Sequence, residues 1–110
     1  MVPSAVGALI LLPFPFSDLS QSKLRPAVVL ADVGRGDWLL CQITSKSYGD
    51  PLAVVLDQVD FASGSLSVQS FARPGKLFTA HDSLFKTEIG KLTATAFGRV
   101  QTAVIRVLKP

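Results

Sequence analysis

Cysteine and histidine each occur once in the 110-residue sequence, as Cys41 and His81. One cysteine cannot form an intramolecular disulfide, so a reducing cytoplasm is the natural compartment for this chain. One cysteine and one histidine also fall short of the ligand sets that zinc sites use. We therefore expect a protein without a metal or cofactor, in which Cys41 is a small buried hydrophobic residue.

Carboxylate pairs and glycine-rich motifs are also missing. Glu88 is the single glutamate, and no spacing among the aspartates marks an acid–base pair. The sequence contains no glycine-rich phosphate loop and no serine in a Gly-x-Ser-x-Gly turn. Any reaction catalysed by this chain must therefore rely on arginine, lysine, threonine, serine and aspartate.

Apolar side chains are abundant, at 48% of the residues against 17% charged ones. This composition predicts an ordered globular protein, and we expect a single domain over residues 1–110. The formal net charge of +3 permits a nucleic-acid partner without requiring one. The apolar segment 5–16 contains Pro13 and Pro15 and is too short to span a bilayer, so we expect a buried strand and no membrane association.

The spacing of the apolar residues predicts a mainly β protein. Short apolar runs predict strands over 9–16, 25–31, 38–45, 52–56, 68–71, 76–79 and 89–92. A polar loop over 17–23, turns over 32–37 and 60–66, a break at 73–75 and a helical turn over 82–86 separate them. From Thr95 the period changes to that of an amphipathic helix, whose apolar face carries Phe97, Val100, Val104, Val107 and Leu108. These elements predict a small curled barrel or half-open sheet capped by one helix.

The segment 23–30 (KLRPAVVL) places an arginine at the mouth of an apolar strand. Pro26 fixes its own backbone and biases Arg25 toward extended geometry, so the cation is rigidly presented. A planar guanidinium with five donors suits an anionic ligand. Any surface strand can begin with Arg-Pro, and this dipeptide alone favours a structural arginine over a ligand-binding one.

Phosphodiester cleavage in RNA is a reaction that these residue types can perform. The 2′-hydroxyl of the substrate is the nucleophile, so the protein does not have to supply one. The protein has to orient the scissile group, stabilise additional negative charge and protonate the leaving oxygen. Arginine suits the charge, and a threonine hydroxyl can orient the phosphate or relay a proton.

Four segments, in order along almost the whole chain, resemble the MazF/PemK toxins of type II toxin–antitoxin systems. They are 14–19 (FPFSDL), 23–30, 42–45 (QITS), and 73–79 (RPGKLFT) with 89–92 (IGKL). The resemblance implies the SH3-like small barrel with a C-terminal helix of MazF-, Kid- and CcdB-like toxins, assembled as a homodimer. It also implies an mRNA interferase, a metal-independent and sequence-selective endoribonuclease acting on single-stranded RNA, with a cognate antitoxin as its partner.

The resemblance also implies roles for individual residues. Arg25 and Thr44 match the catalytic arginine and threonine of the family. Arg25 would stabilise the phosphorane-like charge and is a candidate proton donor to the 5′-oxygen, while Thr44 would orient the phosphate. The alternatives for this pair are a structural strand-end arginine and a β-favoured threonine at a sheet edge. RNA contacts are expected from four further residues, Lys23, Ser45, Arg73 and Lys76.

Two departures from the family pattern concern the loops. Gly7-Ala8 stands where many members have Gly-Asp, and Pro74-Gly75 follows Arg73 where some members have an acidic residue. The first affects the edge of the barrel. The second leaves the identity of a general base open. An Arg-Pro-Gly segment is also common in turns that have no catalytic role.

Several other side chains suggest chemistry but are assigned structural roles. Adjacent His81 and Asp82 suggest an acid–base dyad, yet neighbours in sequence rarely place such a pair usefully, so we favour a capping or surface role. Phe14, Phe16 and Trp38 can stack on bases, but alternating strand aromatics are more typical of a core.

A rival hypothesis keeps this fold without the chemistry. Gyrase-poisoning toxins share the barrel and bind a topoisomerase through an aromatic-bearing C-terminus, whereas this chain ends Val107-Leu108-Lys109-Pro110. That ending counts against a gyrase poison. A catalytically silent RNA-binding member of the family is the third alternative.

Overall fold

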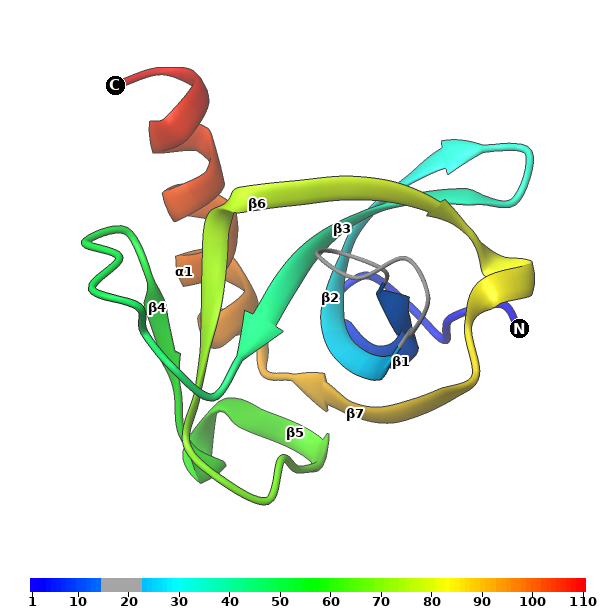
Figure 1. Ribbon diagram of the computed structural model, residues 1–110, viewed down its shortest axis with the longest axis horizontal. Coiled ribbons are helices and arrows are strands. Elements are labelled where there is room, and N and C mark those ends of the chain that lie inside the picture. Colours follow the sequence, from blue (N-terminus) through cyan, green and yellow to red (C-terminus); the bar gives the residue numbers. More distant parts are fainter. Residues whose placement is uncertain (15–22) are drawn as a thin grey trace.

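A computed structural model of the chain describes residues 1–14 and 23–110. Seven strands form one antiparallel sheet in the order β4-β6-β3-β2-β1-β7-β5. Figure 1 shows the sheet curled around itself, with the C-terminal helix α1 beside β4 and β6. The elements are β1 (Ala8–Phe14), β2 (Lys23–Gly34), β3 (Asp37–Thr44), β4 (Val54–Leu56), η1 (Gln58–Asp60), β5 (Phe61–Gly64), β6 (Ser70–His81), η2 (Asp82–Leu84), β7 (Thr87–Leu92) and α1 (Ala94–Leu108). The predicted curled sheet with a C-terminal helix is confirmed.

The first predicted strand and the polar loop after it are only partly described. Residues 15–22, which include Phe16 and most of the predicted loop, lie outside the described residues. Lys23, predicted as the last loop residue, instead opens β2 and pairs with Phe14.

Strand β1 is buried on both faces, as its continuous apolar run predicts. Leu9 and Ile10 are both fully buried but belong to two different clusters of side chains. Burying one such side chain contributes about 1.5–3 kcal/mol, so β1 anchors both halves of the core. Phe14 lies in the second cluster, and Trp38 packs against it, which confirms the predicted core positions of these two aromatics.

Helix α1 covers the first cluster. Thr93 caps its N-terminus by accepting the backbone N–H of Ala96 at 3.1 Å. Val100 and Val104 are buried as predicted, but Leu108 is 75% exposed, and the last turn of the helix extends past the sheet (Figure 1). The predicted apolar face is therefore too long at its C-terminal end. Among the described residues, no helix has the length and apolarity to cross a membrane.

The predicted break at 73–75 is wrong, because β6 continues through it. Between the pairs Cys41–Leu77 and Ile43–Ala72, β3 has one intervening residue whereas β6 has four, 73–76. The extra residues form a bulge, in which Pro74 has no N–H to offer the ladder and is buried. The same local chemistry that predicts a chain break thus produces a bulge when the neighbouring strand holds both sides.

The predicted turn over 60–66 is also wrong in part, since Phe61–Gly64 forms edge strand β5 against β7. Gly64 has φ +65° and pairs with Gly90. A Cβ atom on Gly64 would overlap the carbonyl of Ile89, so this close approach of two backbones requires glycine. The pairing partner lies far along the chain, which local turn signals do not reveal.

Candidate active-site cleft

A cleft of about 360 Å³ opens where β2 begins and β3 ends. Arg25, Thr44 and Ser45 all line it, although they come from different parts of the chain. Three of the six residues predicted for an RNA site are therefore brought together. The cleft also contains two side chains that the sequence reasoning did not select, Lys46 and Tyr48.

Strand pairing explains how Arg25 reaches this cleft. Arg25 lies opposite Leu12 of β1, and the pairing of β2 with β3 ends at Ala27–Gln42. If this register is extended by two residues, Arg25 lies across from Thr44 on the same face of the sheet. Pro26 has no N–H, which is consistent with the ladder ending before Arg25. The side chain of Arg25 is exposed, and no carboxylate of the described residues forms an ion pair with it.

Thr44 is held at the last position of β3, where it pairs with Phe71 of β6. It is 8% exposed, and its Oγ1 accepts the backbone N–H of Lys46 at 3.2 Å. This contact orients the hydroxyl and uses it only as an acceptor. The hydroxyl hydrogen can therefore still be donated to an anionic ligand in the cleft.

The charge of the cleft favours an anion. Its described lining carries two cations, Arg25 and Lys46, and no carboxylate. Hydroxyl groups of Thr44 and Ser45 lie among the same residues and can donate hydrogen bonds. A phosphate group needs this combination of positive charge and donors.

Arg73 lies beside the cleft rather than in its lining. Its Nε donates to Oδ2 of Asp50 at 3.1 Å, and its guanidinium lies 5.2 Å from the ring centroid of Tyr48. The backbone N–H of Leu52 lowers the pKa of Asp50, and Arg73 lowers it further, while burial acts in the opposite direction. Arg73 is thus connected to the cleft through Tyr48.

Lys23 and Lys76 are exposed but do not belong to the described lining of the cleft. Lys23 opens β2, two residues before Arg25, and Lys76 lies in the bulge of β6. The two lysines predicted to bind RNA are therefore outside the described lining that Arg25, Thr44 and Ser45 share.

His81 and Cys41 have structural roles, as predicted. His81 accepts the backbone N–H of Ser83 through Nδ1 at 3.1 Å and caps η2. Burial raises the pKa of the Cys41 thiol to about 12, and its Sγ donates to the carbonyl of Arg73 at 3.2 Å. A thiol with this pKa is not a nucleophile near neutral pH. Among the described residues, no group of three or more His, Cys, Asp or Glu side chains forms a possible metal site.

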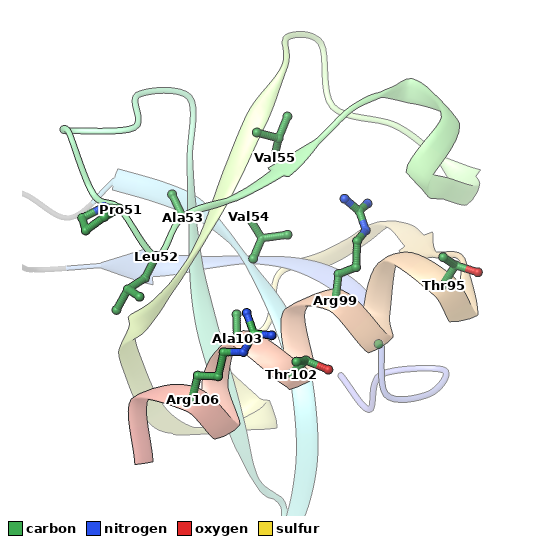
Figure 2. A pocket seen from close by; sticks show the side chains of 11 residues that line it. Pro51, Leu52, Ala53, Val54, Val55, Thr95, Arg99, Thr102, Ala103 and Arg106 are labelled. Carbon is green, nitrogen blue, oxygen red and sulfur yellow. The ribbon is translucent and has the colours of Figure 1, made fainter. Parts of the chain in front are cut away.

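A larger groove, of about 730 Å³, lies between α1 and the segment around β4. Figure 2 shows Arg99 and Arg106 on the helix and the side chains of Leu52 and Val54 across from them. Arg99 donates to Oδ1 of Asp60 at 2.6 Å. This groove contains none of the residues predicted for catalysis.

Comparison with known proteins relates both the sequence and the fold to one group. A family model described as PemK-like, MazF-like toxin of type II toxin–antitoxin system matches residues 5–108. A comparison with curated protein sequences finds no match.

Three solved structures illustrate the likeness in fold. MazF from Deinococcus radiodurans is 22% identical, with 100% of both chains covered and a TM-score of 0.75. The Mycobacterium tuberculosis toxin MazF-mt6 is 17% identical, with 92% of this chain and 95% of that chain covered and a TM-score of 0.72. An endoribonuclease in complex with its cognate antitoxin, from Mycobacterial species, is 13% identical, with 98% of this chain and 95% of that chain covered and a TM-score of 0.71.

Proposed function

The chain belongs to the PemK-like, MazF-like toxins of type II toxin–antitoxin systems, and on that premise we propose that it is a sequence-selective endoribonuclease acting on single-stranded RNA. The observation that carries this proposal is the cleft that Arg25 and Thr44 share. An exposed guanidinium and an oriented hydroxyl at the ends of adjacent strands suit one phosphodiester group.

The proposed reaction is a transesterification within the RNA. The 2′-oxygen forms a bond to phosphorus, the bond from phosphorus to the 5′-oxygen breaks, and the products are a 2′,3′-cyclic phosphate and a 5′-hydroxyl. One proton leaves the 2′-hydroxyl and one is added to the 5′-oxygen, so no water is consumed. This route needs no metal ion, because the substrate supplies the nucleophile and the protein supplies the positive charge.

Arg25 and Thr44 have distinct parts in this scheme. Arg25 stabilises the charge that builds up on the phosphoryl oxygens and is positioned to protonate or hydrogen-bond the leaving 5′-oxygen. Thr44 donates its hydroxyl hydrogen to a non-bridging oxygen and so orients the phosphate. Because its Oγ1 already accepts from Lys46, the direction of that donation is restricted.

Further contacts hold the RNA strand on either side of the scissile group. Ser45 and Lys46 lie in the cleft itself. Lys23 and Lys76 are exposed on β2 and β6, where they can contact backbone phosphates farther along the strand. Arg73 acts at the edge of the cleft, next to Tyr48.

The remaining properties follow from the family premise. We propose a single domain over residues 1–110 that functions as a homodimer in the cytoplasm and is inhibited by a cognate antitoxin. The comparison with an endoribonuclease bound to its cognate antitoxin supports the last point for a relative of the same fold.

The proposal is tested by incubating the purified protein with a mixed-sequence RNA pool in the presence of EDTA and sequencing the new ends. We expect cleavage at a short recurring sequence, and we expect Arg25→Ala to slow it by about 100- to 1,000-fold. Arg35→Asn is the matched control, since it removes the same charge at the exposed turn between β2 and β3, where asparagine tolerates the φ of 59°.

Three outcomes would contradict the proposal. If Arg25→Ala cleaves at the wild-type rate, the assignment of this residue is wrong. Binding of RNA without cleavage of any sequence in the pool would favour a silent RNA-binding member. Trapping of gyrase–DNA complexes without RNA cleavage would favour a gyrase poison.

A further inference from the structure

The loop after β3 holds an aromatic ring in an unusual way. Tyr48 has φ 54° and Gly49 has φ 66°, so two successive residues are left-handed. This conformation is uncommon for a bulky residue. Tyr48 is nevertheless 63% exposed, so the core does not account for the position of its ring.

A chain of contacts fixes this ring from one side. The guanidinium of Arg73 lies over it at 5.2 Å from the centroid, and Arg73 is in turn held by Asp50 at 3.1 Å. The other carboxylate oxygen of Asp50 accepts the backbone N–H of Leu52 at 2.9 Å. The side chains of Arg73 and Asp50 are 20% and 12% exposed, so a largely buried ion pair places the guanidinium against a ring that remains accessible.

The supported ring belongs to the cleft. Tyr48 is part of its lining together with Arg25, Thr44, Ser45 and Lys46. The described lining contains no other aromatic residue, and its cations and hydroxyls suit the sugar–phosphate backbone. A flat apolar surface beside such groups is the arrangement with which proteins bind unpaired nucleobases.

We propose that Tyr48 is the stacking site for one unpaired nucleobase next to the scissile phosphate, and that Arg73 and Asp50 are positioning residues that hold its ring. This inference rests on the proposed RNA cleavage and identifies how the same cleft grips its substrate. Arg73 covers one face of the ring and the base covers the other. Arg73 then supports RNA binding through Tyr48 rather than by a direct contact with a phosphate.

The test measures binding and cleavage by the full-length protein. The probe is a short RNA containing the sequence that the wild-type protein cleaves, with a 2′-deoxyribose at the scissile nucleotide to prevent the reaction. If the wild-type protein cleaves no RNA, the probe is a mixed-sequence single-stranded RNA instead. We expect Tyr48→Leu to raise the Kd about tenfold, whereas Tyr48→Phe stays within about twofold of wild type.

Leucine is the matched replacement because it is bulky, apolar and not β-branched but has no ring face. Tyr48→Asn is a second ringless variant whose backbone tolerates left-handed geometry, in case leucine disturbs the loop. In cleavage of the natural RNA, both should raise KM with little change in kcat, since stacking holds substrate and transition state alike.

A second arm identifies the stacked base. Abasic nucleotides are introduced one at a time around the cleavage position, and the effect of Tyr48→Leu is measured on each RNA. We expect the effect to vanish at one position only, where the base that stacks is missing. Asp50→Asn and Arg73→Gln should raise the Kd about threefold in the wild-type background and add nothing to Tyr48→Leu.

Several results would overturn the stacking site. One is that Tyr48→Leu and Tyr48→Asn bind the RNA as tightly as the wild type. Another is that Tyr48→Phe does not bind the RNA. A third is that Tyr48→Leu weakens binding equally on every abasic RNA. Weaker binding of a protein partner with unchanged RNA binding would assign Tyr48 to a protein interface instead. Failure of the proposed function is seen separately, as absence of cleavage by the wild type, and the Kd ratios then still decide on stacking. Absence of any RNA binding by the wild type would overturn both.

Discussion

The cleft beside β2 and β3 and the groove between β4 and α1 are both lined by two basic side chains and by threonine. They differ in what holds those groups. In the cleft, Arg25 and Thr44 lie at the ends of neighbouring strands, next to a hydrogen-bonded ladder. In the groove, Arg99 and Arg106 lie two turns apart on one helix and face apolar side chains (Figure 2). The groove has twice the volume, yet only the cleft presents a cation and an oriented hydroxyl across two elements.

On our proposal that the smaller cleft is the catalytic site, volume alone does not identify such a site. A phosphoryl transfer needs donors fixed relative to each other to within a fraction of an ångström. Adjacent strands supply that precision, because each ladder hydrogen bond restricts the same pair of backbones. The groove is larger, and its two arginines come from a single helix.

The largest expected difference between the cleft and the groove is in the rate of RNA cleavage after an arginine in each is replaced with lysine. Arg25→Lys should lower kcat/KM for RNA cleavage by about 100-fold, because lysine keeps the charge but loses the planar fork of donors. Arg106→Lys, the matched change in the groove, should stay within about twofold of wild type. The two rates are measured on the same fluorescent RNA under single-turnover conditions.

If Arg25→Lys and Arg106→Lys slow RNA cleavage equally, the cleft and the groove do not differ in their part in the reaction. Near-normal cleavage by Arg25→Lys would mean that only a positive charge is required there, and that the shape of the guanidinium is unimportant.

A smaller difference is expected for the threonines. Thr44→Val should lower kcat by about 10- to 100-fold, because the isosteric methyl group cannot donate to the phosphate. Thr44→Ser should retain most of the activity, and Thr102→Val in the groove should leave it unchanged within about twofold. The measurement is the single-turnover rate at saturating enzyme.

Loss of stability is the competing explanation for Thr44→Val, since Oγ1 accepts from Lys46. Removing that acceptor costs about 1 kcal/mol, which urea unfolding would detect. If the fall in kcat disappears at low temperature, where both proteins are fully folded, the hydroxyl has only a structural role.

The smallest expected effects are on stability and concern the ion pairs beside the cleft (Arg73–Asp50) and beside the groove (Arg99–Asp60). Asp50→Asn should lower the free energy of unfolding by about 1 kcal/mol and Asp60→Asn by about 0.5 kcal/mol or less. The reason is that the Arg99 side chain is 47% exposed whereas the Arg73 side chain is 20% exposed. Urea unfolding at pH 7 makes this comparison.

The pH dependence of stability gives an independent check on the first pair. The pKa of Asp50 is lowered in the folded protein from its ordinary value of 3.8. Its contribution is therefore fully present above that pH and is lost as the pH falls through the folded pKa. The gap between wild type and Asp50→Asn should close below about pH 3.8, and a gap that stays constant would mean that the carboxylate charge does not stabilise the fold.

The parts of the fold that depend on local pattern were predictable from the sequence. Continuous apolar character identified β1 as a strand buried on both faces, and three-to-four-residue spacing identified α1. The parts of the fold that depend on partners far along the chain were not predictable in this way. Local turn residues predict a turn where β5 forms, because its partner β7 lies far along the chain. Arg-Pro-Gly predicts a break in β6, but pairing with β3 on both sides turns this segment into a bulge.

The candidate site divides in the same way. The Arg-Pro dipeptide indicates Arg25 and the family resemblance implies Thr44, and the structure places both in one cleft. Tyr48 did not stand out, since a single tyrosine in a predicted loop has no periodic or motif signal. Its relation to the cleft depends on the folded chain, in which Arg73 pairs with Asp50, 23 residues away, and places its guanidinium over the ring.

The order of residues alone is enough to identify β1 and α1, the residue types available for chemistry, and the extended geometry in which Pro26 presents Arg25. These properties depend on side-chain periodicity and on backbone restrictions within a few residues. Folding of the whole chain is needed to bring Arg25 and Thr44 into one cleft and to place Arg73 against Asp50 and Tyr48. Those contacts depend on strand register and on a bulge, which are set by pairing between segments far apart in the chain.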